Sequence, residues 1–229
     1  MKSLYLGLIC LLLVSSCKSE PKQTSLKVET KELSIAEKIA NAHGFEQWKN
    51  VSEVKFTFQV DTDTRNGKGR SWSWYPKTDE VLFESLYGEK RYSRSDMDST
   101  QMANDRGFIN DKFWLLVPFQ LVWDTSATIS EPTKAQAPIS KTELNRITLT
   151  YSDEGGYTPG DAYDIFYDEQ FIIREWVYRK GNSAEPSLTT TFENYKDYNG
   201  IKIATDHKQE GGNWNLYFTD ISITLDDQK

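Results

Sequence analysis

The chain has 229 residues, a formal net charge of −7, and 7 Trp, 12 Tyr and 11 Phe. This aromatic content argues against intrinsic disorder, because disordered chains are poor in aromatic and apolar residues. The negative charge argues against nucleic acid as a partner, since binding to phosphates depends on Lys and Arg. We therefore expect a folded protein that does not bind nucleic acid.

Residues 1–16 have the features of a bacterial lipoprotein signal peptide. The apolar run from Leu4 to Val14 covers roughly 16 Å as a helix, about half of a hydrocarbon core, so it is too short to span a membrane. It ends in Val14-Ser15-Ser16-Cys17, which resembles a lipobox, the motif whose cysteine is lipidated. An ordinary secretory peptide with an incidental cysteine is the alternative.

Cys17 is the expected lipidation site and membrane anchor. Lys18, and not Asp, follows it, which fits retention at the outer membrane. Residues 17–33 are polar and lack periodicity, as in a flexible tether. The sequence thus predicts an outer-membrane lipoprotein of the cell envelope, facing either the periplasm or the surface, with a single domain over residues 34–229.

A short helix opens the domain. Ser34 and Glu37 have the spacing of a capping box, in which each side chain binds a backbone amide of the first turn. The apolar stripe that follows predicts a helix ending near His43, and Gly44 suits the left-handed residue after a helix. A second short turn is expected over residues 45–49.

In the segment that follows, apolar residues recur at every second position. Alternation from Val54 to Val60 predicts a strand with one buried face, and Asn66-Gly67 is a strong hairpin signal. The expected strands are residues 51–60, the segment around Trp72 and Trp74, 81–86 and 90–95, followed by a loop over 96–106.

Residues 110–123 are apolar on every side, which predicts a helix that is buried all round or covers an apolar ligand. Pro118 lacks an amide hydrogen and should interrupt this helix. A loop with Pro132 and Pro138 follows. The last third alternates like an antiparallel meander, with expected strands at residues 147–151, 163–168, 171–179, 188–198, 201–209 and 214–224. The total is about ten strands and two or three helices.

Catalytic motifs are absent from the sequence. His43 and His207 have no evident partner, the chain after Cys17 has no thiol, and the common serine-hydrolase and zinc-protease motifs do not occur. The acids near Gly155 resemble a solvated loop more than a calcium site. We therefore expect no enzyme activity, no cofactor and no metal, although a pair of acids for glycoside hydrolysis stays open because its spacing is a tertiary property.

The order of the elements, together with several aromatic stretches, resembles the outer-membrane lipoprotein carrier-like (LolA-like) half-barrel group, and more closely a related Bacteroidota lipoprotein family of unknown function. The stretches that carry the resemblance are residues 39–44 with Trp48, 71–74, 113–118, 157–163 and 193–201. The resemblance implies a mainly β (α+β) fold: a curved antiparallel sheet or half-barrel with helices packed on its concave face. It also implies binding of lipid or acyl chains. The carriers of that group are soluble, whereas Cys17 would tie this chain to a membrane.

We therefore expect a lipid-anchored, non-enzymatic protein that binds a hydrophobic ligand, a lipid or acyl chain, in a half-barrel cleft. The expected lining residues are Trp72, Trp74, Phe113, Trp114 and Val117. The same aromatic residues would otherwise form a large core. Two other functions stay open: a surface glycan-binding or hydrolytic lipoprotein, and a structural accessory of an envelope complex.

Overall fold

The computed structural model describes residues 32–64, 66–67, 69–85 and 88–226. The chain divides into two units, Met1–Glu32 and Leu33–Lys229, and every described helix and strand belongs to the second. The expected signal peptide, the lipidation site Cys17 and residues 18–31 of the tether lie outside the described residues. Within the described ranges, no helix has the length and apolar character needed to cross a membrane.

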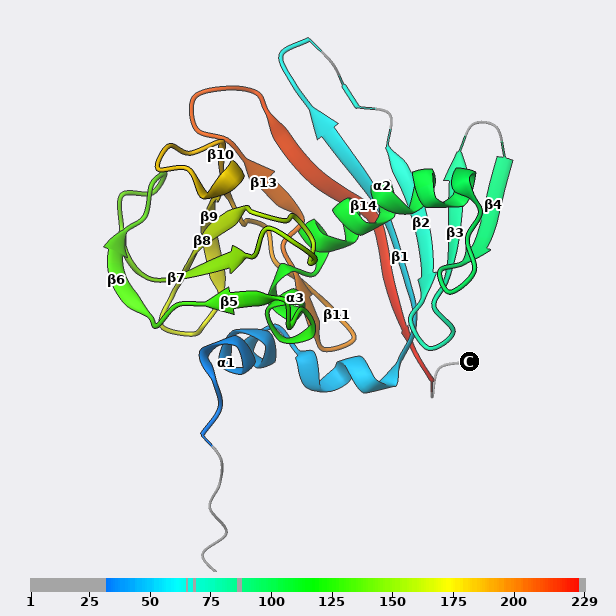
Figure 1. Ribbon diagram of the computed structural model, residues 1–229, viewed down its shortest axis with the longest axis horizontal. Helices are drawn as coiled ribbons and strands as arrows, with labels where there is room; N and C mark the ends of the chain where they lie inside the picture. Colours follow the sequence, from blue (N-terminus) through cyan, green and yellow to red (C-terminus); the bar gives the residue numbers. More distant parts are fainter. Residues whose placement is uncertain (1–31, 65, 68, 86–87, 227–229) are drawn as a thin grey trace, which may run out of the picture. The chain divides into compact units, whose positions relative to one another are not determined.

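The first antiparallel sheet contains the first and the last strand of the domain, β1 and β14 (Figure 1). Its six strands follow the order β13-β14-β1-β2-β3-β4. Their bounds are β1 Val51–Asp61, β2 Arg70–Tyr75, β3 Glu80–Ser85, β4 Gly88–Ser93, β13 Asp206–Lys208 and β14 Asn215–Leu225. As the alternation predicts, Val54, Phe56 and Phe58 are buried.

The second antiparallel sheet follows the order β10-β9-β8-β7-β5, and β6 also pairs with β7. The bounds are β5 Ala127–Ile129, β6 Thr133–Gln136, β7 Glu143–Tyr151, β8 Ala162–Tyr167, β9 Ile173–Arg179 and β10 Leu188–Thr191. A two-stranded sheet joins β11 Lys196–Tyr198 to β12 Ile201–Ile203.

The two larger sheets meet where the chain continues beyond β10 alongside β13. The Glu193 amide donates to the Asp206 carbonyl at 2.9 Å, and the Thr205 amide donates to the Glu193 carbonyl at 3.0 Å. The sheets therefore continue into one curved antiparallel arrangement that ends at β4 on one side and at β5 and β6 on the other. This confirms the predicted fold class: mainly β, with fourteen strands in the described part of the chain and a few packed helices.

The first helix, α1 Ile35–Ala42, forms as predicted. The Ser34 hydroxyl accepts from the Glu37 amide, and the Glu37 carboxylate accepts from the Ser34 amide at 2.7 Å, which completes the capping box. Gly44 has φ 92°, the left-handed conformation expected after a helix. The short 3-10 helix η1 Phe45–Asn50 leads into β1, and η2 Lys180–Asn182 follows β9.

The prediction of a loop over residues 96–106 is wrong, because helix α2 Ser99–Leu115 begins within this segment. The Asp98 carboxylate accepts from the amides of Thr100 and Gln101, both at 2.8 Å, and the Gln101 side chain accepts from the Asp98 amide. This is a second capping box. Helix α3 Val117–Trp123 follows, and the predicted interruption occurs where α2 ends before Pro118.

Two of the expected long strands are also divided. Residues 188–198 form β10 and β11, and residues 201–209 form β12 and β13. Asn194 has φ 53°, so the backbone leaves the extended conformation between β10 and β11. β10 ends before this bend and β11 begins after it, which alternation alone did not show.

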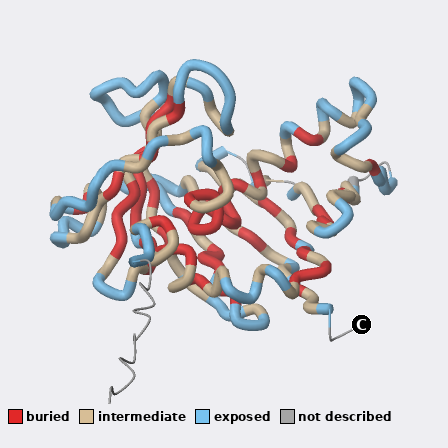
Figure 2. Tube along the Cα trace, turned by 60° about the horizontal axis from the view of Figure 1, so that its bottom comes forward, coloured by how far each residue is buried: buried red, intermediate tan, exposed pale blue. Residues whose placement is uncertain are grey.

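Helix α2 packs against both sheets. Its Phe108 contacts Trp72 of the first sheet at 5.6 Å between ring centroids, and its Trp114 contacts Trp176 of the second sheet at 4.3 Å. Figure 2 shows buried positions concentrated in the strands and exposed ones in the connecting loops. The core therefore lies on the concave face of the sheet, beneath α2 and α3.

Candidate functional site

A cavity of about 430 Å³ lies between α2 and the concave faces of both sheets. Its size is within the range of small-molecule sites. The lining residues are Phe58, Val60, Asn110, Trp114, Tyr157, Thr158, Tyr163, Trp176, Tyr178, Leu188, Trp214 and Leu216. They are aromatic, aliphatic or neutral polar residues.

Strand alternation places these side chains on one face. Trp176 and Tyr178 are two residues apart on β9, and Phe58 and Val60 are two apart on β1, so each pair points the same way. Val60 also lies opposite Leu216 of β14 in the register of the first sheet. On α2, Asn110 and Trp114 are one helical turn apart. The cavity is therefore formed by the regular geometry of five strands and a helix, completed by the loop of Tyr157 and Thr158.

The aromatic wall is packed edge to face and in tilted pairs. The ring centroids of Trp114 and Trp176 are 4.3 Å apart with an interplanar angle of 64°. Tyr163 lies 5.1 Å from both Trp176 and Tyr178. Aromatic pairs in these geometries attract each other more strongly than their buried apolar area alone accounts for. The wall is therefore pre-formed.

The tyrosine hydroxyls of the lining are bound by the protein itself. The Tyr157 hydroxyl donates to Asn110 Oδ1 at 3.0 Å, and the Tyr178 hydroxyl donates to Asp161 Oδ2 at 2.8 Å. Tyr163 shares a hydrogen bond of 2.9 Å with Thr158. The polar tips are thus satisfied, and the rings supply the wall.

The lining is electrically neutral. Burial, followed by the hydrogen bond to Asp161, raises the pKa of Tyr178 to about 12, and burial raises the pKa of Tyr157 and Tyr163 as well. No Asp, Glu, Lys or Arg lines the cavity among the described residues. Such a surface suits an uncharged, apolar ligand segment, because a charge placed there would lose its hydration without gaining a partner.

Of the five expected lining residues, the structure places Trp114 in the cavity wall. Phe113 is buried behind the wall, stacked on Tyr157 at 3.8 Å with an interplanar angle of 6°. Val117 is buried at the start of α3. Trp72 and Trp74 are buried elsewhere, against Phe108.

Trp72 has a different contact from the one expected. Its indole N–H donates to Asp111 Oδ2 at 2.9 Å. Arg70 also binds Asp111, with Nε to Oδ2 at 2.8 Å and Nη2 to Oδ1 at 2.6 Å. This contact and the bond from Arg94 Nε to Asp105 at 2.8 Å fasten α2 to the first sheet.

The remaining lining residues were missed by the sequence analysis. The signal for some of them was present: Tyr163, Trp176 and Tyr178 lie on expected strands, and Trp176 and Tyr178 share a face by alternation. Alternation did not show which face is concave. The loop residues Tyr157 and Thr158 gave no periodic signal at all.

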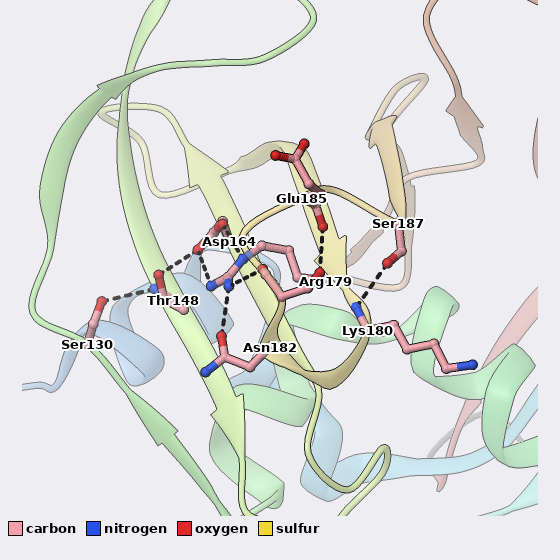
Figure 3. A network of polar contacts seen from close by, with 9 residues as sticks. Ser130, Thr148, Asp164, Arg179, Lys180, Asn182, Glu185 and Ser187 are labelled. Atoms are coloured by element: carbon pink, nitrogen blue, oxygen red, sulfur yellow. Dashed lines mark hydrogen bonds and ion pairs between the residues drawn. The ribbon is translucent and has the colours of Figure 1, made fainter.

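A polar network occupies the opposite face of the second sheet (Figure 3). Asp164 lies between Tyr163 and Ile165 on β8, so it points away from the cavity. The Arg179 guanidinium binds Asp164 at 3.0 Å, and also Asn182 Oδ1 at 2.7 Å and the Ser183 carbonyl at 2.9 Å. This network holds the connection that leads into β10 and the lining residue Leu188.

Both histidines are buried and neither lines the cavity, although the His207 ring packs behind the lining residue Trp114 at 5.3 Å between ring centroids. The Nδ1–H of His43 donates to the Ile39 carbonyl at 2.8 Å, and that of His207 donates to the Thr191 carbonyl at 3.2 Å. Burial lowers the pKa of each to about 4, so both are neutral at pH 7. In the described ranges, no group of three or more His, Cys, Asp or Glu is arranged to hold a metal ion.

No protein-family model matches the sequence. A search of curated proteins also gives no match.

Solved structures do resemble the chain. A LolA superfamily protein from Nitrosomonas europaea has a TM-score of 0.52 at 12% identity, over 85% of this chain and 96% of that one. A DUF1329 family protein from Desulfovibrio piger has a TM-score of 0.45 at 8% identity, over 84% and 92%. An outer membrane lipoprotein-sorting protein domain from Vibrio parahaemolyticus has a TM-score of 0.43 at 11% identity, over 82% and 93%. At 12% identity, the first of these likenesses concerns the fold alone: this chain has a LolA-like curved sheet with helices packed on its concave face.

Proposed function

We propose that the chain is an outer-membrane lipoprotein, anchored through Cys17, that binds a lipid or acyl chain in the cavity without catalysing a reaction. One observation carries the proposal: the cavity of about 430 Å³ is bounded by aromatic and aliphatic side chains from both sheets and from α2. The sequence resemblance to the LolA-like half-barrel group points to the same ligand class. The neutral lining makes an acyl chain a better occupant than a charged metabolite.

Partitioning would drive the binding. An acyl chain that buries roughly 300 Å² of apolar surface gains about 7 kcal/mol before the costs of ordering. Such a gain supports weak to micromolar binding. Because the hydroxyls of Tyr157, Tyr163 and Tyr178 already have protein partners, the ligand needs no hydrogen-bonding group for them. The buried indole N–H of Trp176 has no partner among the described residues.

The test compares neighbouring positions of β10. Leu188 lines the cavity, and Thr189 follows it with its side chain on the other face of the strand. Both side chains are partly exposed, so glutamate is tolerable at either position. The chain from Lys18 onward, exported behind a cleavable secretory signal peptide, is purified from the bacterial periplasm in three forms: the parent, Leu188→Glu and Thr189→Glu.

Native mass spectrometry then measures co-purifying lipid and uptake of added palmitate. We expect stoichiometric ligand on the parent and on Thr189→Glu, and loss of ligand on Leu188→Glu with unchanged far-UV circular dichroism. A parent protein that carries no lipid and takes up no palmitate would refute the proposal. Equal uptake by Leu188→Glu and Thr189→Glu would place the ligand outside this cavity.

The anchor has its own test. Metabolic labelling with radioactive palmitate and fractionation of the envelope compare the parent with Cys17→Ser. We expect label and membrane association in the parent and neither in the variant. Persistent labelling of Cys17→Ser contradicts lipidation at this residue.

A further inference from the structure

The Lys112 ammonium lies in an aromatic cluster on the side of α2 away from the cavity. Its Nζ is 5.1 Å from the centroid of the Trp74 ring and 5.9 Å from those of Phe108 and Trp123. Cations are attracted to ring faces within about 6 Å. Asn110 and Trp114 of the same helix face the cavity, so Lys112 marks a separate place in the fold.

This ammonium lacks an acceptor. In the described part of the chain, neither a hydrogen bond nor an ion pair joins Lys112 Nζ to another residue. A lysine ammonium carries three N–H donors. Because Lys112 is partly exposed, water is the acceptor available to these donors where the described part of the chain supplies none. The ring faces attract the positive charge, but they provide no oxygen acceptor for its N–H donors.

The nearest carboxylates are engaged by other groups. Asp79 and Asp105 both accept from the Arg94 guanidinium, at 3.2 and 2.8 Å. Asp124 accepts from the Ser126 amide at 3.0 Å. The charged groups that act on Lys112 are therefore these three acids and Arg94, and none of the acids is within ion-pair distance of its ammonium.

The surroundings offer an apolar contact surface next to the ammonium. Trp48 lies 5.3 Å from Trp74 and 4.7 Å from Trp123 between ring centroids. Trp48, Trp123 and Lys112 are all partly exposed, whereas Trp74 is 7% exposed. A molecule arriving from solvent can reach both the ammonium and the two partly exposed indoles.

We propose that Lys112, with Trp48, Trp74 and Trp123, forms a binding site for a carboxylate or phosphate group carried on an apolar body. The oxyanion accepts the hydrogen bonds that the ammonium does not make within the chain, and the apolar body packs on the indole rings. This site is independent of the acyl-chain cavity, so either proposal can fail while the other stands.

Burial, followed by the charge of Arg94, lowers the pKa of Lys112 to about 8. The amine is then mostly protonated at pH 7 and mostly neutral at pH 9.5. Binding of an oxyanion through this group should weaken across that interval. This fall in affinity with rising pH is a readout that does not depend on any substitution.

The test uses isothermal titration calorimetry on the full-length chain in a non-ionic detergent. The probes are hexanoate, hexyl phosphate, inorganic phosphate and the neutral hexanamide, all short enough to stay monomeric. The variants are Lys112→Met, which keeps an unbranched side chain without the charge, and Arg106→Met, which removes an exposed charge from the same helix.

We expect hexanoate or hexyl phosphate to bind the parent and Arg106→Met, and to bind Lys112→Met at least about tenfold more weakly, as for a lost charge-assisted hydrogen bond. Affinity for the parent should also fall about tenfold between pH 7 and pH 9.5. Equal binding of hexanamide, equal affinity of Lys112→Met, or an unchanged affinity at pH 9.5 would each overturn the proposal. Inorganic phosphate that binds as tightly as hexyl phosphate would refute the apolar part of the site.

Discussion

Replacing Asp111 by alanine should destabilise the domain strongly, although the residue belongs to no cavity or catalytic group. Its carboxylate is fully buried and accepts from Arg70, from the Trp72 indole at 2.9 Å and from Asn110 Nδ2 of the side-chain amide at 3.0 Å. The substitution removes all these bonds at once. It therefore breaks the hydrogen bonds that join the C-terminal half of α2 to β2.

The magnitude follows from the exposure of each partner. Trp72 is 2% exposed, so its orphaned N–H costs about 1–3 kcal/mol. The Arg70 side chain is 43% exposed and can return to water, so the lost ion pair adds only about 1 kcal/mol. We expect the free energy of unfolding to fall by about 2–4 kcal/mol.

Urea unfolding, followed by tryptophan fluorescence and far-UV circular dichroism, measures this loss. A second substitution, Trp72→Phe, supplies the control because phenylalanine has no N–H to leave unpaired. In the Asp111→Ala background, Trp72→Phe should cost less than it costs alone, by about 1–2 kcal/mol. A loss below about 0.5 kcal/mol for Asp111→Ala, or strict additivity of the two changes, would refute the reasoning.

Two further predictions concern the helix start and the histidines. Asp98→Ala should lower the free energy of unfolding by about 0.5–2 kcal/mol in urea titrations, because it removes the acceptor for two amides of the first turn; unchanged stability would mean that α2 does not begin at this cap. The pKa of His207 is about 4 in the folded chain and near 6.5 in the unfolded one, so below pH 6.5 the unfolded chain takes up the proton first. Stability should therefore be complete above pH 7 and fall as the pH drops from about 6.5 to about 4, by up to about 3 kcal/mol for this group. Unfolding titrations of the parent and of His207→Gln between pH 7 and pH 4.5 check this, and an equal pH slope in both proteins contradicts it.

The local sequence signals predicted much of the scaffold correctly. The capping box of Ser34 and Glu37 forms as expected, because it depends only on residues three apart. The alternation around Phe56 also gives the buried face of β1, since side chains of a strand alternate by geometry. Both signals act within a few residues of the chain.

Predicting the position of the cavity would have required knowledge of contacts between residues far apart in the sequence. Trp114 and Trp72 look equally suited to a lining from sequence, but only Trp114 borders the cavity. The difference arises because α2 packs on Trp72 of the first sheet through Phe108, whereas farther along the helix Trp114 and Trp176 of the second sheet together form part of the cavity wall. Strand parity cannot give the point at which a helix crosses a sheet.

The first half of α2 was wrongly predicted as a loop because its charged residues, Asp105 among them, hide the apolar stripe of a helix. A helix facing a core normally shows an apolar stripe, but the face of α2 that meets the first sheet carries Asp105 and Asp111 among its buried residues. Arg94 and Arg70 compensate these buried charges from the region of β4 and β2. The partners are 11 and 41 residues away in sequence. The side of α2 with Asn110 and Trp114 is thereby left to bound the cavity, so the charged contacts that hide the helix in the sequence also hold the cavity wall in place.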